Sequence, residues 1–412
     1  MDFLKLANGI NTPFYLYDFN EIENRFNSIK KAFSGAKNNI FYAVKANSNL
    51  SLLKLLVNLD SGFDCVSANE IRRALKVGAK PYKIIFSGVG KKKEELEFAI
   101  EQKILYINIE SNAELELLES IAKEKNVIAN ISIRVNPNID AKTHPYISTG
   151  LKENKFGVSI DDARAMFLKA HKSEFLNPIG VHFHIGSNIL ELDSIIQAAI
   201  LVEKFIKELN TAGLNIKFFD IGGGVGIKYK NDEIEPNLDE FANIIKNIAR
   251  AQDLTICCEP GRYIVGNAGY LVSKVLYEKT NEGKRFVICD ASMCELIRPS
   301  LYEAYHEILS FPSENKLNES SLADLVGGVC ESGDFLAKDV VLPPLKPNDL
   351  IVIKSSGAYG FVMSSNYNSR TKVAEYALYN NELKLINKAQ SFDELIANEL
   401  CCLWVCYEFR RY

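Results

Sequence analysis

Short apolar runs rich in β-branched and aromatic residues alternate with amphipathic stretches from about residue 40 to residue 262. Most runs are near-continuously apolar, which is typical of strands buried on both faces of a parallel sheet. Between them, apolar residues recur at helical spacing, often after an Asn, Ser or Asp that can cap the first turn. Eight such strands separated by helices predict a closed (β/α)8 barrel of the TIM type. The expected strands are 40–47, 62–67, 82–88, 104–111, 129–137, 178–187, 216–224 and 254–262.

The pattern changes after about residue 265, where strand-like runs are joined by turn-rich segments without regular helices. This predicts an antiparallel β domain, a barrel or a sandwich, at the C-terminal end. The early run PFYLYD is expected to join it, and the segment NEIENRFNSIKKAF to form a helix leading into the barrel. We therefore predict an α/β protein with a barrel over 25–265 and an antiparallel β domain built from 1–24 and 266–412.

Composition fits two globular domains. The 412 residues carry 48 Lys+Arg against 52 Asp+Glu, which argues against disorder and against a broad cationic face for nucleic acid. No run approaches the roughly 18 apolar residues of a membrane helix, and the first residues do not resemble a signal peptide. Nine cysteines without paired CxxC motifs predict reduced thiols and no zinc site. We expect a cytoplasmic protein with no nucleic-acid or membrane partner.

Ionisable residues gather at the carboxyl ends of the expected barrel strands, where barrel enzymes place their chemistry. Lys45, inside FYAVKAN, either extends out of the barrel mouth or has a lowered pKa that lets it form a Schiff base with an aldehyde. The motif DIGGGVG would expose consecutive backbone N–H groups, which can hold a phosphate, although a tight turn is the alternative. Arg262 on the neighbouring loop is placed to add a charged contact. The complete set is Lys45, Asp64, Arg134, His184, 222–224, Glu259 and Arg262.

Two more strand ends complete the pattern. The segment HFHIGS places His182 and His184 on one face of a strand, with Ser187 just beyond it. His184 is either a core residue or a flat ring that packs against a planar cofactor. Glu259 ends an apolar strand, and a carboxylate facing a pyridine nitrogen keeps that nitrogen protonated. Together these residues predict pyridoxal 5'-phosphate and no metal. The lysine suits its aldehyde, the glycines and the arginine its phosphate, the histidine its ring face and the glutamate its ring nitrogen.

Eight segments between residues 41 and 370 resemble the barrel-type (fold type III) pyridoxal-phosphate decarboxylases, and most closely the diaminopimelate decarboxylases among them. The segments are FYAVKAN, FDCVSANEI, GVHFHIGS, DIGGG, EPGRYIV, LIRPSLYEAYHEI, CESGDFLA and GAYGFVMSSNYNSR. The resemblance implies decarboxylation of meso-2,6-diaminopimelate to L-lysine and CO2, the last step of lysine biosynthesis. It also implies a homodimer in which each active site is completed at the subunit interface.

The resemblance further implies roles for the matching residues. Lys45 would carry the cofactor beside Asp64, with His184 stacked on the ring and Glu259 at the ring nitrogen. Cys330 in CESGD would donate the proton to the decarboxylated carbon across the dimer interface, whereas a buried structural thiol is the reading from its residue type alone. The remaining contacts to the cofactor would come from Ser187, Gly223, Gly224, Gly261, Arg262 and Tyr359.

Substrate choice can be argued from charge. Ornithine ends in a bare ammonium, whereas diaminopimelate ends in an amino acid, so its distal carboxylate needs a donor. Arg298 in LIRPSLY offers a guanidinium fork with Tyr302 beside it, and Glu331 can accept the ammonium. A surface or interface salt bridge is the alternative for Arg298. Arg262 and Tyr359 are the other expected substrate contacts.

Three other functions share parts of this pattern. A decarboxylase of ornithine, arginine or a carboxylated polyamine such as carboxynorspermidine is disfavoured by Arg298 and Glu331. A racemase is disfavoured by Glu259, because related racemases set an arginine at the ring nitrogen, and a non-enzymatic carrier would resemble the barrel alone. The sequence departs from the family at Ser292 and Cys294, where Gly and Asn are more frequent, and over 399–412, which resembles nothing expected.

Overall fold

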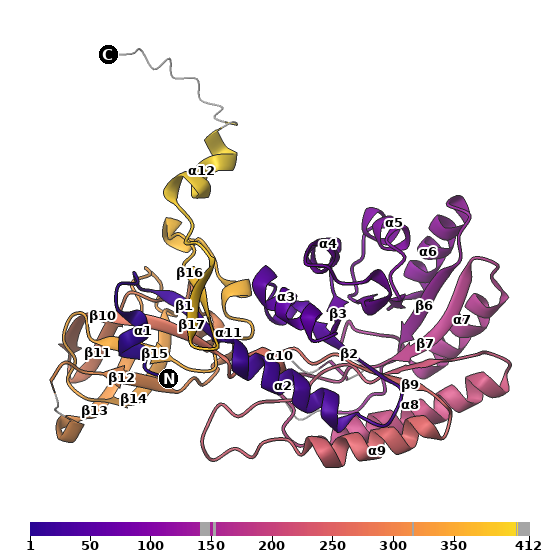
Figure 1. Cartoon of the computed structure of the whole chain (residues 1–412), viewed down its shortest axis with the longest axis horizontal. Coiled ribbons are helices and arrows are strands. Elements are labelled where there is room, and N and C mark those ends of the chain that lie inside the picture. Colours follow the sequence, from indigo (N-terminus) through magenta and orange to yellow (C-terminus); the bar gives the residue numbers. More distant parts are fainter. Residues whose placement is uncertain (141–148, 151–153, 315–316, 401, 403–412) are drawn as a thin grey trace. The chain divides into compact units, whose positions relative to one another are not determined.

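A computed structural model describes residues 1–140, 149–150, 154–314, 317–400 and 402 (Figure 1). The chain divides into two compact units. The barrel unit comprises Asp18–Gly269 and Ser355–Val362, and the β unit comprises Met1–Tyr17, Tyr270–Lys354 and the chain from Met363 onward. The segment Ser355–Val362 therefore returns to the barrel unit, whereas the sequence pattern placed it with the rest of the second domain.

Eight parallel strands close a barrel within the described residues, with neighbours in sequence order and the last strand paired to the first. The predicted (β/α)8 barrel is thereby confirmed. The strands are β2 (Asn38–Ala43), β3 (Gly62–Cys65), β4 (Ile84–Phe86), β5 (Tyr106–Ile109), β6 (Ala129–Arg134), β7 (Leu176–His182), β8 (Phe218–Asp220) and β9 (Thr255–Cys258).

Helices surround these strands (Figure 1). Polar residues cap several of their first turns, as expected; Ser67, Ser111 and Ser159 each accept a hydrogen bond from a backbone N–H of the helix that follows. The helices are α2 (Phe19–Ala32), α3 (Leu50–Asn58), α4 (Ala68–Lys76), α5 (Lys93–Glu101), α6 (Asn112–Glu124), α7 (Ile160–Lys172), α8 (Asp193–Thr211), α9 (Leu238–Arg250) and the short α10 (Arg262–Val265), with 3-10 turns η1 (Val44–Ala46) and η2 (Pro81–Lys83).

Large side chains fill the inside of the barrel. One buried cluster contains Phe41, Ile85, Tyr106, Ile179 and Cys257, which come from five different strands. Every residue of the short strands β3, β4 and β5 is buried, which explains their near-continuous apolar pattern. Because the interior is packed, a site for a small molecule has to be built at the strand ends.

The β unit contains a nine-stranded sheet within the described residues, in the order β14-β13-β11-β10-β1-β16-β17, with β15 joining β10 to β12. The strand β1 joins this sheet as predicted. The register pairs are antiparallel except for β11 with β13, which run parallel, so the sheet is mixed. The strands are β1 (Phe14–Asp18), β10 (Gly269–Asn281), β11 (Lys284–Cys289), β12 (Ile308–Phe311), β13 (Ser321–Val326), β14 (Phe335–Leu342), β15 (Leu350–Ile353), β16 (Ala374–Tyr379) and β17 (Glu382–Asn387).

Short helices complete the β unit, and its core joins Phe3, Phe14, Leu16, Val272 and Val352. Within the described part of the chain, none of the helices is both long and apolar enough to cross a membrane. Of the unusual segment 399–412, residues 401 and 403–412 lie outside the described residues. The helices are α1 (Phe3–Ala7), α11 (Arg298–Tyr302) and α12 (Phe392–Leu400), with 3-10 turns η4 (Leu317–Glu319), η5 (Phe361–Met363) and η6 (Tyr367–Ser369).

Candidate active site

Lys45 lies in the 3-10 turn η1, directly after strand β2. Its Nζ lies 3.3 Å from Oδ2 of Asp64, which is fully buried on the adjacent strand β3. Burial lowers the pKa of the Lys45 ammonium, but the charges of Asp64, Tyr359 and Glu259 outweigh burial, so the pKa lies above its ordinary value. Of the two alternatives for Lys45, the one with a lowered pKa is therefore not met in the chain by itself, because the pattern around Lys45 did not reveal the buried carboxyl groups near it.

Glu259 follows strand β9 and is only 4% exposed. Its Oε2 lies 3.4 Å from Nε2 of the buried His182, and no N–H or hydroxyl group of the described residues donates to its Oε1. Burial raises the pKa of Glu259 to about 8; Asp64 adds to the rise, and Lys45 and Arg134 oppose it. A protonated ring nitrogen is the kind of partner that an orphaned, buried carboxyl oxygen needs.

His184 lies just beyond strand β7, and its ring is fixed by the glycine loop. Its Nδ1 accepts a hydrogen bond of 3.2 Å from the backbone N–H of Gly223. Burial, together with the charges of Arg134 and Lys45, holds the pKa of His184 well below its usual value. The ring is therefore a neutral imidazole with its proton on Nε2, a flat surface without charge.

The loop after strand β8 needs glycine because other backbone segments approach it closely. A Cβ at Gly223 would lie 2.3 Å from the carbonyl oxygen of Glu259, and one at Gly224, whose φ is +99°, would lie 2.6 Å from that of Gly186. Gly261 is crowded in the same way by Ala43 and Ala46. This loop, with its backbone N–H groups and no side chains, can hold a phosphate.

Arg262 gathers the other residues expected around the phosphate. Its Nη2 donates a hydrogen bond of 3.1 Å to Oγ of Ser187, and its Nη1 donates one of 2.8 Å to the hydroxyl of Tyr229. Its guanidinium lies 4.9 Å from the centre of the Tyr359 ring. Tyr359 has a left-handed backbone (φ 56°), and its N–H donates to the carbonyl of Ala46, which ties it to the turn bearing Lys45. The structure thus brings together the cofactor residues predicted in the barrel unit.

Four predicted site residues belong to the β unit instead: Arg298, Tyr302, Cys330 and Glu331. The buried Arg298 begins α11, and its Nη1 lies 2.8 Å from Nε2 of His306, whose Nδ1 lies 2.8 Å from the carbonyl oxygen of Lys354. Because a carbonyl only accepts, His306 carries its proton on Nδ1 and accepts from Arg298 through Nε2. Tyr302 ends the same helix and is half-buried.

Cys330 is exposed in the described chain, so the structural alternative of a buried thiol is wrong. The turn that presents it is well defined: the Cys330 N–H donates to Oδ1 of Asn368, and the buried Asp334 accepts hydrogen bonds from the backbone of Met293 and Val329. Glu331, next to Cys330, is exposed as well. An ordered turn that exposes a thiol and a carboxylate is suited to contact with another molecule, such as a substrate or a second subunit.

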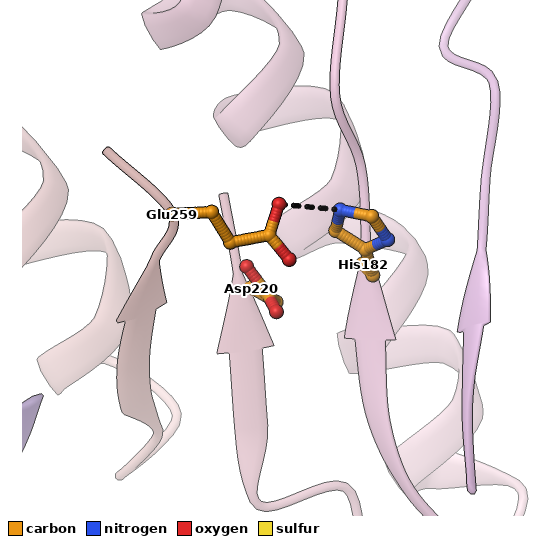
Figure 2. Close-up of side chains that lie close together, drawn as sticks. All are labelled: His182, Asp220 and Glu259. Carbon is orange, nitrogen blue, oxygen red and sulfur yellow. Dashed lines mark ion pairs between the residues drawn. The ribbon is translucent and has the colours of Figure 1, made fainter. Parts of the chain in front are cut away.

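Sequence reasoning left three neighbours of the site without a role. Tyr229 bonds Arg262 from a loop that has no motif, so no signal pointed to it. Arg134 was recognisable as the last residue of a barrel strand; it lies 3.2 Å from the buried Glu110. Asp220 was seen only as the first letter of DIGGG. With His182 and Glu259 it forms a buried cluster of three ionisable groups, in which one nitrogen or oxygen atom of each lies within 4.8 Å of the others (Figure 2).

This fold and this set of residues define a barrel-type pyridoxal-phosphate enzyme, and comparison with known proteins agrees. The family model described as "Pyridoxal-dependent decarboxylase, pyridoxal binding domain" matches residues 19–266. The diaminopimelate decarboxylase of Campylobacter jejuni is 59% identical over 399 residues, covering 97% of this chain and 98% of that protein. The one of Aquifex aeolicus is 44% identical over 96% of this chain and 93% of that protein.

A solved structure agrees as well. The crystal structure of diaminopimelate decarboxylase from Helicobacter pylori complexed with L-lysine superposes with a TM-score of 0.94 at 51% identity, covering 98% of this chain and all of that one. The chain belongs to the pyridoxal-dependent decarboxylases and, within them, to the diaminopimelate decarboxylase family. The predicted resemblance and the predicted cofactor, pyridoxal phosphate, are confirmed.

Proposed function

We propose that this chain removes CO2 from meso-2,6-diaminopimelate and releases L-lysine. The observation that carries the chemistry is the buried Glu259, whose Oε1 receives no N–H or hydroxyl donor from the described residues and whose strand lies beside that of Lys45. The substrate assignment is supported by relatives named diaminopimelate decarboxylase, one of which binds L-lysine in its crystal structure.

The barrel-unit residues fit pyridoxal phosphate. Bound through its aldehyde, this cofactor supplies an electron sink for the pair left when the Cα–carboxylate bond breaks. Lys45 offers the amine for the aldehyde, and Asp64 holds the charge of that amine in place. Glu259 would keep a proton on the ring nitrogen, and the neutral His184 would lie against the ring without adding charge.

The phosphate contacts come from groups that are already in place. The glycine loop brings its backbone close, with the Gly224 N–H as a donor while that of Gly223 donates to His184, and Ser187 and Arg262 are linked by a hydrogen bond. Tyr359 packs its ring against the guanidinium of Arg262 and so limits its movement. Preformed contacts reduce the entropy lost when the phosphate binds.

Arg298 is proposed to bind the distal carboxylate of the substrate, with Tyr302 and Glu331 as neighbours for the distal amino acid. Its support is its burial at the start of α11 and the hydrogen bond to His306, which orients the guanidinium while His306 donates its own proton to the carbonyl of Lys354. A positive fork that stays charged suits a carboxylate ligand.

A homodimer is proposed to complete each site. Its support is the exposure of Cys330 and Glu331 on a well-defined turn, which fits a role in the active site of the second subunit. Cys330 would then return the proton to the substrate carbon after CO2 leaves. We place the reaction in the cytoplasm, because Cys65, Cys257 and Cys258 are free thiols and reduced cysteines are usual there.

Substitution of Arg298 tests the substrate assignment. Arg298→Ala should lower kcat/KM for diaminopimelate by roughly a hundred-fold or more, because removing one partner of a buried charged pair costs about 2–5 kcal/mol. Arg285→Ala is the matched control, since Arg285 makes its contacts elsewhere in the same unit, with Glu278 and Leu342. Unchanged activity of Arg298→Ala with diaminopimelate would contradict the assignment.

A further inference from the structure

Three buried ionisable side chains lie side by side at the ends of neighbouring barrel strands. They are His182 on β7, Asp220 on β8 and Glu259 after β9, and Figure 2 shows the carboxyl groups of Asp220 and Glu259 facing each other. Their exposed fractions are 1%, 0% and 4%. The proposed role of Glu259 accounts for one of the three and leaves Asp220 and His182 without a function.

The other charges around this cluster are already matched. Lys45 lies 3.3 Å from Asp64, and Arg134 lies 3.2 Å from Glu110. These pairs come from η1, β3, β6 and the end of β5, and they include the cations whose charges act on Glu259. Neither cation is therefore free to neutralise a second carboxylate.

Asp220 and Glu259 would carry two negative charges side by side if both were ionised. A pyridinium at Glu259 balances one of them, and burying the second without a partner would be very costly. His182 does not supply the missing charge, because burial lowers its pKa to about 4 and keeps the ring neutral at ordinary pH. One proton must therefore be held on the carboxyl pair.

Asp220 can hold this proton even though it accepts two hydrogen bonds, which by themselves lower its pKa. Oδ2 of Asp220 accepts a hydrogen bond of 2.8 Å from the hydroxyl of Tyr106, and Oδ1 accepts one of 3.0 Å from the N–H of Gly222. A carboxylic acid can accept both of these bonds and still donate its own proton. Asp220 is fully buried inside the barrel, whereas Glu259 is the residue proposed to face the ring nitrogen, where a negative charge would be useful.

We propose that Asp220 is a positioning residue that keeps its proton and donates it in a hydrogen bond to the Glu259 carboxylate. This bond fixes the orientation of Glu259 and leaves it with a single negative charge toward the ring nitrogen. The inference rests on the proposed role of Glu259. Burial and the nearby Glu259 raise the pKa of Asp220 to about 8, in the direction that this assignment requires.

Infrared spectroscopy of the holoenzyme near pH 7 detects the proton directly. A protonated-carboxyl band should shift when aspartate is labelled with ¹³C at its side-chain carboxyl, and it should vanish in Asp220→Asn. Asp324→Asn is the matched control, because Asp324 is a buried aspartate paired with Lys284 at 2.6 Å, and its loss should leave the band unchanged. A band that shifts only with labelled glutamate, or no such band at all, overturns the proposal.

Kinetics supply a second readout. The amide of Asp220→Asn can still donate to Glu259, so kcat should stay within about three-fold of wild type, whereas Asp220→Ala should lose about 10- to 100-fold in kcat with little change in KM. Equal losses in both variants would contradict a donor role. If Asp220→Asn does not fold, isotope labelling of the unaltered enzyme still shows whether the protonated carboxyl group belongs to an aspartate or to a glutamate. The infrared band does not depend on turnover, so failure of the proposed substrate is distinguished from failure of this inference.

Discussion

Replacing Gly223 by alanine tests whether the glycine loop controls the position of Glu259, the glutamate proposed to act on the cofactor. The backbone of Gly223 is not left-handed, so alanine meets no conformational strain there. Its Cβ, however, would lie 2.3 Å from the carbonyl oxygen and 3.2 Å from the carbonyl carbon of Glu259. Since such contacts are essentially never below 3.0 Å, the two strand ends must separate by at least about 0.7 Å.

A shift of this size acts on catalysis more than on folding. Misplacement of reacting groups by about 1 Å can cost about 100-fold in rate, so we expect kcat to fall by roughly 10- to 100-fold. Overpacking costs about 1–3 kcal/mol, which a chain of this size can tolerate. The N–H of Gly223 also holds His184, so cofactor affinity should fall together with kcat.

Steady-state kinetics, cofactor titration by absorbance and thermal unfolding separate these effects. Gly90→Ala is the control, because a Cβ at Gly90 meets nothing within 4 Å, and it should match wild type in all three. If Gly223→Ala retained wild-type kcat and cofactor affinity, the argument that this loop positions Glu259 and His184 would fail.

Three further predictions concern the dimer, pH and the phosphate. Chains carrying Lys45→Ala and Cys330→Ala should each be inactive, and mixing them should restore roughly a quarter of wild-type activity if sites are shared between subunits; no recovery in mixed dimers would contradict sharing. The folded-state pKa of Glu259 is about 8 against an ordinary 4.5, so its contribution to the stability of the cofactor-free chain should be lost as pH rises toward 8, and denaturant titrations should show this loss reduced in Glu259→Gln; an equal pH dependence in both would refute it. Arg262→Lys should weaken cofactor binding by about ten-fold, because lysine cannot form the fork, whereas unchanged affinity would remove Arg262 from the phosphate site.

The barrel could be predicted because its strands are apolar on both faces and its helices carry serine, asparagine or aspartate caps. The same periodicity cannot show that a late segment returns to an earlier unit. Ser355–Val362 is the example, since its tie to Ala46 through Tyr359 is a long-range contact without any local signal. Only the resemblance to a known family placed Tyr359 in the site.

The candidate site followed from residue types at strand ends, but its electrostatics did not. A lowered pKa was one of two alternatives for Lys45, and the structure shows the nearby carboxyl groups, Asp64 above all, raising it instead. Asp220 looked like part of a glycine motif until its side chain was seen against Glu259 (Figure 2). The sequence shows which side chains can ionise, but only their packing shows which of them lie close enough to change one another's protonation.

Product analysis tests the central claim most directly. Purified protein with pyridoxal phosphate would be incubated separately with diaminopimelate, ornithine and arginine, following CO2 and the amine formed. We predict equal amounts of L-lysine and CO2 from diaminopimelate and no product from the other two. CO2 from ornithine or arginine, with none from diaminopimelate, would leave the barrel and cofactor intact and contradict the proposed reaction.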